Sequence, residues 1–313
     1  MKFLKPKFWG YKKPNFLSYL LLPLTFPLII NNFFLRFKKK DINHSKIKKI
    51  CIGNIYLGGT GKTPLVIKIY KILNQLGYKT AVIKKFYKDH IDEQKILEKN
   101  TKLYCLKNRV IALMEAIKDN NNIVIFDDGL QDRSLNYDLK FVCFNNIQWV
   151  GNGLLIPAGP LREKIESISK YDVVFINGNE FDSSNLKLLI NTYNENIKIF
   201  EAHYFPTNID QFDTTKRYIA FSGIGNPESF RETLLKNKFN IIKEITFPDH
   251  HNYTQANIDA IKLQARYLNA KIITTEKDYV KLNTYKNADI QYLKVELKIK
   301  NEKELIAYLM LYI

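Results

Sequence analysis

A glycine-rich stretch, YLGGTGKTPLV at residues 56–66, contains the residue types that hold phosphate groups. The phosphate-binding loop pattern is G-x-x-x-x-G-K-[ST], and Gly61, Lys62 and Thr63 match its end. Its first glycine is replaced by Tyr56. Flexible glycines still allow backbone N–H groups to turn toward phosphate oxygens. We therefore expect a nucleotide to be bound by Tyr56, Leu57, Gly58, Gly59, Thr60, Gly61, Lys62 and Thr63.

Such a loop requires acidic residues nearby that hold a metal ion. The apolar run NIVIFDD at residues 122–128 ends in Asp127 and Asp128, at the carboxyl end of an expected buried strand. Together with the hydroxyl of Thr63, these carboxylates would bind Mg²⁺ beside the phosphates, and Lys62 would bridge the β- and γ-phosphates. The guanine-specific motif N-K-x-D is absent from the sequence, so ATP is the expected nucleotide.

The elements that must position these residues alternate between strands and helices. Strands are expected at residues 48–55, 80–85, 122–128, 139–144 and 172–177, and helices at 62–76 and 109–120. This alternation predicts an α/β fold with a P-loop NTPase-like parallel sheet. A second set of strands and helices starts near Arg217 and predicts a smaller α/β domain. The expected segments are residues 1–40, 41–205, 206–300 and a C-terminal helix at 301–313.

The first forty residues contain nine Lys or Arg and no acid. Between the basic flanks, residues 16–30 are apolar but include Pro23 and Pro27. Fifteen helical residues span ~22 Å, which is short for a bilayer core of ~30 Å. A signal peptide and a helix packed on the protein's own core are alternatives. We expect a membrane-associated helix that lies in the interface of an anionic membrane surface.

The composition of the chain indicates which binding partners and which cellular compartment to expect. The net charge of +17 favours an anionic partner, such as nucleic acid, a membrane surface or a phosphorylated substrate, although a lysine-rich composition alone could produce it. Cys51, Cys105 and Cys143 form no C-x-x-C pair, and Cys51 and Cys143 lie in apolar runs. We expect reduced, buried thiols, as in a cytoplasmic protein.

Six motifs in this order, GGTGKTP, DDGLQ, GNGLLIPAGPLRE, FSGIGNPESF, FPDHHNYT and TTEKDYVKL, resemble the tetraacyldisaccharide 4′-kinase family over nearly the whole chain. The resemblance implies transfer of the γ-phosphoryl group of ATP to the 4′-hydroxyl of a tetraacyldisaccharide 1-phosphate, the lipid A precursor, with Mg²⁺. The product would be lipid IVA. It also implies association with the cytoplasmic face of the bacterial inner membrane, and no protein partner is expected.

The resemblance also implies roles for individual residues. Asp92 matches the aspartate of a G-D-E-P motif, a catalytic base or its partner, and His250 matches a histidine that works with it. Arg162 and Glu163 match residues near phosphate and metal. With Lys62, this makes Asp92, His250 and Arg162 the expected catalytic residues, and Thr63, Asp127, Asp128 and Glu163 the expected metal ligands.

One region departs from the family pattern. Lys84 and Lys85 stand where Ser and Arg are expected, and the following loop is short, with Ile91 and Gln94 around the acidic motif in place of Gly and Pro. Asp89 is therefore an alternative to Asp92.

Asp92 is expected in the P-loop half and His250 in the second domain, so that the two would meet only when the domains close. Two other functions are weighed against the kinase: a basic P-loop ATPase that acts on nucleic acid, for which no recognition module is found, and a membrane GTP-binding protein.

Overall fold

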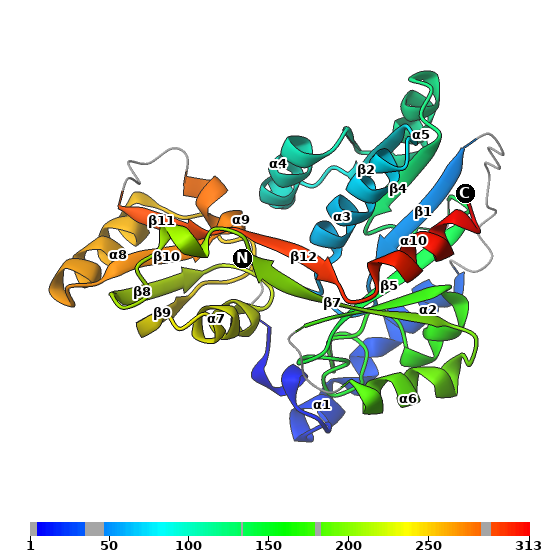
Figure 1. The fold of residues 1–313 in the computed structure, drawn as a ribbon. Coiled ribbons are helices and arrows are strands. Elements are labelled where there is room, and N and C mark those ends of the chain that lie inside the picture. Colours follow the sequence, from blue (N-terminus) through cyan, green and yellow to red (C-terminus); the bar gives the residue numbers. More distant parts are fainter. Residues whose placement is uncertain (1–4, 35–46, 133, 179–182, 283–288) are drawn as a thin grey trace. The chain divides into compact units, whose positions relative to one another are not determined.

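The computed structural model of the 313-residue chain describes residues 5–34, 47–132, 134–178, 183–282 and 289–313. The expected boundary at residues 40 and 41 lies outside this part. The chain forms two compact units (Figure 1). We call the described residues of Lys5–Tyr87, Leu97–His203 and Ile299–Ile313 the P-loop unit, and those of Lys88–Ile96 and Tyr204–Lys298 the small unit.

The P-loop unit is built on an eight-stranded sheet in the order β12-β7-β6-β5-β1-β4-β2-β3. Every strand pair from β7 to β3 is parallel, as the alternating sequence pattern predicts. β7 and β12 form one edge, and the boundary between the units runs through both strands. The strands are β1 (Lys48–Gly53), β2 (Thr80–Lys85), β3 (Leu103–Leu106), β4 (Ile123–Asp127), β5 (Leu139–Asn145), β6 (Val173–Asn177), β7 (Lys198–Pro206) and β12 (Val295–Ile299).

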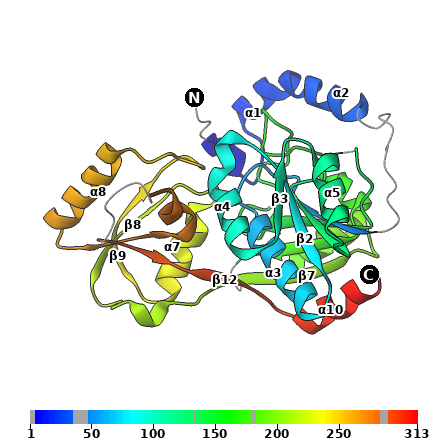
Figure 2. The same ribbon diagram turned by 90° about the horizontal axis from the view of Figure 1, so that it is seen from above.

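Helices pack on both faces of this sheet (Figure 2). The helix α3 follows β1 and buries Leu65, Ile69 and Leu73. The helix α5 buries Leu113 and Ala116 against residues of β2 and β4. Right-handed crossovers account for this placement, because the chain moves outward from β1 to β2 and inward from β3 to β4. The helices of this unit are α3 (Lys62–Gln75), α5 (Arg109–Lys118), α6 (Ser184–Tyr193) and α10 (Glu302–Met310), and the second part of α4 (Ile91–Asn100), whose residues up to Ile96 group with the small unit.

The start and end of α3 follow from glycines. Gly61 precedes the helix with a φ of 85°, a left-handed conformation that glycine adopts without steric cost. Gly77 follows it with a φ of 89°, and its N–H donates to the carbonyl of Asn74. A glycine in this conformation is a common helix C-terminal signal. The helix N-terminus is thereby fixed at the carboxyl end of β1, next to the end of β4.

The small unit contains a four-stranded parallel sheet in the order β11-β10-β8-β9. Phe230 and Leu234 of α7 pack on one face with Tyr218, whereas Ile258 and Ile261 of α8 pack on the other. The second α/β set predicted from the sequence is thus observed. Its elements are β8 (Arg217–Ser222), α7 (Pro227–Lys236), β9 (Asn240–Thr246), α8 (Gln255–Tyr267), β10 (Lys271–Thr275), α9 (Glu276–Tyr279) and β11 (Ile290–Leu293).

The N-terminal segment forms two short helices, α1 (Phe16–Leu21) and α2 (Phe26–Phe34), joined by a 3-10 turn at Leu22–Thr25 that contains Pro23. Trp9 is buried, and its indole N–H donates to the carbonyl of Pro157 at 3.0 Å. In the described part of the chain, no helix has the length and apolarity required to cross a bilayer. Most of α1 and α2 is exposed, but Ser18 and Thr25 are buried and Leu28 packs against the buried Tyr56, so the segment also contacts the protein, as the alternative of a packed helix expects.

The cysteines behave as expected. Cys51 and Cys143 are buried free thiols, and Cys105 is half-buried and also free. Burial raises the pKa of the Cys143 thiol to about 12, so it stays protonated at neutral pH.

Candidate active site

Asn54 organises the glycine-rich loop. Its buried side-chain amide donates to the carbonyl of Tyr56 at 2.6 Å, to the carbonyl of Gly58 at 3.2 Å and to the hydroxyl of Thr60 at 3.0 Å. Gly58 has a φ of 117°, which favours glycine strongly. Asn54 thus holds three points of the loop in place, a role that the loop motif does not indicate.

The first two residues of the predicted nucleotide site have structural contacts of their own. Tyr56 is buried against Leu155 and Leu161, and the N–H of Leu57 donates to the carbonyl of Pro160 at 2.9 Å. A tyrosine therefore fits where the pattern has glycine, because its side chain belongs to the core.

Thr63 and Asp127 lie together at the ends of α3 and β4. The hydroxyl of Thr63 is 3.4 Å from Oδ2 of Asp127, and Nζ of Lys84 is 2.6 Å from the same oxygen. Lys84 and Asp127 are both buried, so they form a buried ion pair. Oδ1 of Asp127 is buried without a hydrogen-bond partner in the described structure. Lys84, at the position where the family pattern differs, therefore neutralises one predicted metal ligand.

Asp128 connects the two predicted phosphate-binding cations. Nη1 of Arg162 is 3.1 Å from its Oδ1, and Nζ of Lys62 is 3.8 Å from the same atom. Burial favours the neutral carboxyl, but Lys62 and Arg162 outweigh this effect and lower the pKa of Asp128 to about 2. Asp128 also adopts a left-handed φ of 59°, and the guanidinium of Arg109 donates to its carbonyl at 2.7 Å.

Gln131, in the DDGLQ motif, joins the loop to the predicted metal ligand Glu163. Its side-chain amide donates to the carbonyl of Asn54 and to Oε1 of Glu163, both at 3.0 Å. Sequence reasoning assigned no role to Gln131, Asn54 or Arg109. For Gln131, its place in the DDGLQ motif was the available signal, whereas Asn54 and Arg109 lie outside the recognised motifs.

In the small unit, Asp92 and His250 are in direct contact. Nδ1 of His250 lies 3.0 and 3.1 Å from the two carboxylate oxygens of Asp92. Asp92 is buried in the first turn of α4, whereas Asp89 is exposed. This arrangement favours Asp92 over Asp89 as the residue that pairs with His250.

Two lysines of the TTEKDYVKL motif complete this cluster. Nζ of Lys281 and Nζ of Lys277 lie 3.4 and 3.6 Å from Oδ2 of Asp92. Burial alone would raise the pKa of Asp92, but the hydrogen bond from His250 and the charges of both lysines lower it well below its usual range. Asp92 is therefore ionised at neutral pH. The sequence analysis assigned this motif no chemistry, because a lysine in a turn resembles any solvated charge.

The expectation that Asp92 and His250 meet only on domain closure is wrong. Residues Lys88–Ile96 group with the small unit, so Asp92 and His250 belong to the same unit. The reason is that the chain leaves the P-loop sheet after β2, and the ion pairs of Asp92 are formed with His250, Lys277 and Lys281. Their contact needs no closure.

Comparisons with known proteins match this chain to one family over nearly its full length. The model of the family described as "Tetraacyldisaccharide-1-P 4'-kinase" matches residues 17–312. A tetraacyldisaccharide 4′-kinase from Pelagibacter ubique is 49% identical, covering 97% of this chain and 96% of the relative. The enzyme of the same name from Rickettsia typhi is 36% identical, covering 96% of each.

A solved structure has the same fold. The structure of LpxK from Aquifex aeolicus in complex with ATP superposes with a TM-score of 0.67 at 21% sequence identity, covering 94% of this chain and 98% of that one. The family model and the two relatives show that this chain belongs to the tetraacyldisaccharide-1-P 4′-kinase family.

Proposed function

We propose that this protein transfers the γ-phosphoryl group of ATP to the 4′-hydroxyl of a tetraacyldisaccharide 1-phosphate and so forms lipid IVA. Family membership supports the reaction and the lipid acceptor, because the relatives from Pelagibacter ubique and Rickettsia typhi are named for them. The ATP complex of the Aquifex aeolicus protein supports the choice of donor.

The observation that carries the proposal is the group of side chains at the end of β4. Lys62 and Thr63 begin α3. Asp127 ends β4 within hydrogen-bond distance of Thr63, and Asp128 follows it within ion-pair distance of Lys62. Phosphoryl transfer depends on positioning and charge neutralisation, for which a loop lysine, a hydroxyl and paired carboxylates are the recurring groups.

Mg²⁺ fits the residues present. The hydroxyl of Thr63 and the carboxylates of Asp127, Asp128 and Glu163 are the hard oxygen donors that Mg²⁺ prefers. The buried Oδ1 of Asp127, which has no partner in the described structure, has lone pairs to offer. When bound, Mg²⁺ would neutralise phosphate charge during transfer.

The chain's own cations have distinct tasks. Lys62 would contact the phosphate oxygens that gain charge, and Arg162, held by Asp128, would neutralise the same charge. Asp128 keeps the two cations from repelling each other before the nucleotide binds, because its carboxylate contacts both.

Asp92 would accept the proton of the sugar hydroxyl. His250 donates from Nδ1 to Asp92, which orients the carboxylate, and Lys277 and Lys281 keep it ionised. A carboxylate with a low pKa is a weak base. Its contribution is then to position the hydroxyl and to receive the proton as the oxygen–phosphorus bond forms.

The N-terminal segment supports a location at the cytoplasmic face of the bacterial inner membrane. Phe16, Leu20, Leu24 and Phe26 are each at least 60% exposed, which is costly for large apolar side chains in water. Basic residues precede these apolar residues in the sequence. Such a surface suits an interfacial site on anionic lipids, from which the lipid acceptor could be taken. The exposed lysines next to this surface are Lys7, Lys12 and Lys13.

A transfer assay tests the proposal. Purified protein is incubated with ATP labelled at the γ-phosphate and with tetraacyldisaccharide 1-phosphate in micelles, and the lipids are separated by thin-layer chromatography. We expect label in the lipid only when the acceptor carries a free 4′-hydroxyl. An unlabelled lipid, together with ATP hydrolysis that nucleic acid stimulates, would support the ATPase alternative instead.

A further inference from the structure

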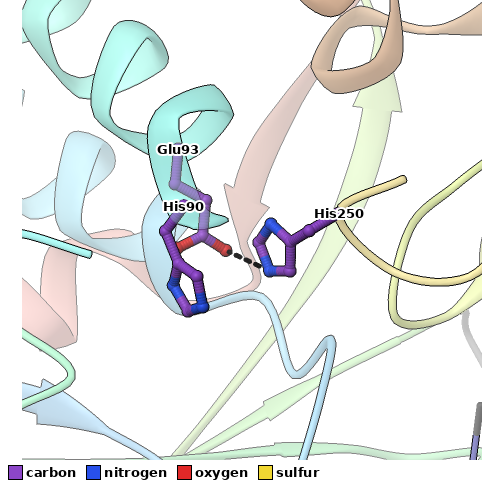
Figure 3. Close-up of side chains that lie close together, drawn as sticks. All are labelled: His90, Glu93 and His250. Carbon is purple, nitrogen blue, oxygen red and sulfur yellow. Dashed lines mark ion pairs between the residues drawn. The ribbon is translucent and has the colours of Figure 1, made fainter. Parts of the chain in front are cut away.

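Three potential metal ligands gather beside Asp92 in the small unit, namely His90, Glu93 and His250 (Figure 3). One ligand atom of each residue lies within 4.8 Å of the others. Nδ1 of His90 is 3.6 Å from Oε2 of Glu93, and Nε2 of His250 is 3.8 Å from Oε1 of Glu93. His90 ends the 3-10 turn Lys88–His90 just before α4, Glu93 is in the first turn of α4, and His250 comes from the loop between β9 and α8.

We propose that His90, Glu93 and His250 bind a divalent transition-metal ion, with Zn²⁺ as the best match. Two imidazoles and one carboxylate suit Zn²⁺, whereas Mg²⁺ selects oxygen ligands. Three protein ligands leave a fourth position of a tetrahedral ion open. This site is therefore chemically different from the oxygen site at Asp127 and Thr63, and it lies in the other unit.

Asp92 prepares His250 for this role. Nδ1 of His250 lies 3.0 and 3.1 Å from the two carboxylate oxygens of Asp92, which suits the tautomer that donates from Nδ1. In the neutral ring, the lone pair is then at Nε2, on the side of Glu93. A carboxylate that binds the far nitrogen of a metal-ligating histidine is a recurrent arrangement, because it fixes the tautomer and makes the ligand more basic.

The charge around the cluster also favours a cation. The linked ion pairs contain four carboxylates and two ammonium groups, so two negative charges are in excess when both imidazoles are neutral. A divalent ion would balance them. Lys277 contacts Glu93, and when a metal binds it would keep its contacts with Asp92 and Asp249. The charged side chains are those of Asp92, Glu93, Asp249, Asp278, Lys277 and Lys281.

Metal binding requires one movement. The rings of His90 and His250 are stacked with centroids 4.3 Å apart and an interplanar angle of 9°. A metal ion must lie close to the plane of each ligating ring, at ~2.0–2.1 Å from the nitrogen, so two parallel rings cannot both ligate it. His90 is the more exposed of the two and can rotate out of the stack.

A bound ion would occupy Nε2 of His250, the partner of Asp92. This consequence rests on the proposed function: transfer of phosphate to the lipid should be inhibited when the site is filled. Zinc binding itself does not depend on the proposed function, because the three ligands and their geometry are present in the protein without substrate.

Zinc binding to the full chain is the direct test, measured by equilibrium dialysis without ATP. We expect one Zn²⁺ per wild-type chain. His90→Phe keeps an aromatic ring to stack on His250 but removes the ligand, so its affinity should fall by at least ~10-fold, as should that of Glu93→Gln. His203→Gln is the matched control, because it removes a histidine of the P-loop unit, and it should bind as wild type does. Circular dichroism verifies that each variant is folded.

The inhibition assay separates the two proposals. Free Zn²⁺ is set with a metal buffer, because ATP itself binds zinc, and each variant is compared with its own zinc-free rate. We expect wild type to be inhibited at least ~10-fold more strongly than His90→Phe, in line with the affinity loss. Equal zinc binding by wild type, His90→Phe and Glu93→Gln would overturn the site. If zinc binding depends on His90 and Glu93 but the protein phosphorylates no lipid, the metal site would be supported and the proposed kinase activity contradicted.

Discussion

Asp92 has a histidine and two lysines as partners, and this arrangement permits a specific kinetic test. Because Asp92 and His250 are in contact within one unit, they should act together. We expect Asp92→Asn and His250→Gln each to lower kcat by ~10²–10⁴-fold, the range typical of acid–base groups, with little change in ATP affinity. Steady-state kinetics of the lipid-dependent reaction measures this.

The double variant is the decisive part of this experiment. Residues that act as a unit are not additive, so the double variant should be little slower than the slower single one. If the kcat losses of the two single variants multiply in the double variant, Asp92 and His250 have separate roles. Asp89→Asn is the control, since Asp89 is exposed, and it should remain close to wild type.

Asp128 links pH to stability. Its pKa is lowered to about 2 because Lys62 and Arg162 outweigh the effect of burial. A lowered pKa stabilises the folded state above the unfolded value of ~3.9, and this stabilisation is lost as pH falls toward the folded pKa. A difference of nearly two pKa units corresponds to ~2 kcal/mol of unfolding free energy.

We therefore compare the urea-unfolding free energies of wild type and Asp128→Asn. The difference between them should be constant from pH 7 to about 5 and should shrink below about pH 4, where the carboxylate starts to gain a proton in the unfolded state. A difference that does not change down to the lowest pH at which both proteins fold would contradict the ion-pair account.

Residues that belong to local patterns could be predicted, and those that act over long sequence distances could not. Lys62, Thr63, Asp127 and Asp128 follow from a loop motif and the end of an apolar strand. The residues that form ion pairs with the predicted site residues have no such local signal in the sequence. Lys84 pairs with Asp127 from 43 positions away. Lys281, in the 3-10 turn Val280–Leu282 after α9, reaches Asp92 only because this turn and the start of α4 belong to the same unit.

At the scale of elements, sequence patterns located α3, the large parallel sheet and the second, smaller set of strands and helices correctly. The segment Lys88–Ile96 was assigned to the wrong unit because sequence order suggests that a chain stays in its domain. The neighbouring strands β11 and β12, which only Lys294 separates, pair in different sheets. Sequence patterns report the type of an element but not the unit in which it packs.

The exposed face of α1 and α2 has a testable consequence. Replacing Leu20, Leu24 and Phe26 by Asn removes apolar surface without disturbing the buried Trp9. Each large apolar side chain gains ~1.5–3 kcal/mol on full burial, so partial burial of three in lipid should contribute at least ~10-fold to partitioning. We expect the variant to sediment with anionic vesicles at least ~10-fold less well.

A matched control uses apolar residues of another helix. Leu263→Asn and Tyr267→Asn replace exposed residues of α8 and should leave vesicle binding unchanged. Equal sedimentation of the α1–α2 variant and wild type would show that another surface, such as the general excess of lysine, binds the membrane.

At the scale of the whole molecule, the net charge of +17 agrees equally with a membrane, a nucleic acid or a phosphorylated lipid, so charge alone does not select a function. Three features select it together: the phosphate loop with its acidic pair, the Asp92–His250 pair, and family membership along residues 17–312. Each of these three features argues against a different alternative function. Only the family names the acceptor.

Transfer of phosphate by Lys62→Ala tests the central claim most directly. Lys62 should meet charge that develops on the phosphates, and removal of one such group costs ~10²–10³-fold in rate. Lys71→Ala, a change at an exposed lysine of the same helix, is the matched control. With both variants folded, we expect Lys62→Ala to transfer label from ATP to the lipid at least ~100-fold more slowly than wild type, and Lys71→Ala to equal wild type. Wild-type transfer by a folded Lys62→Ala would contradict the account.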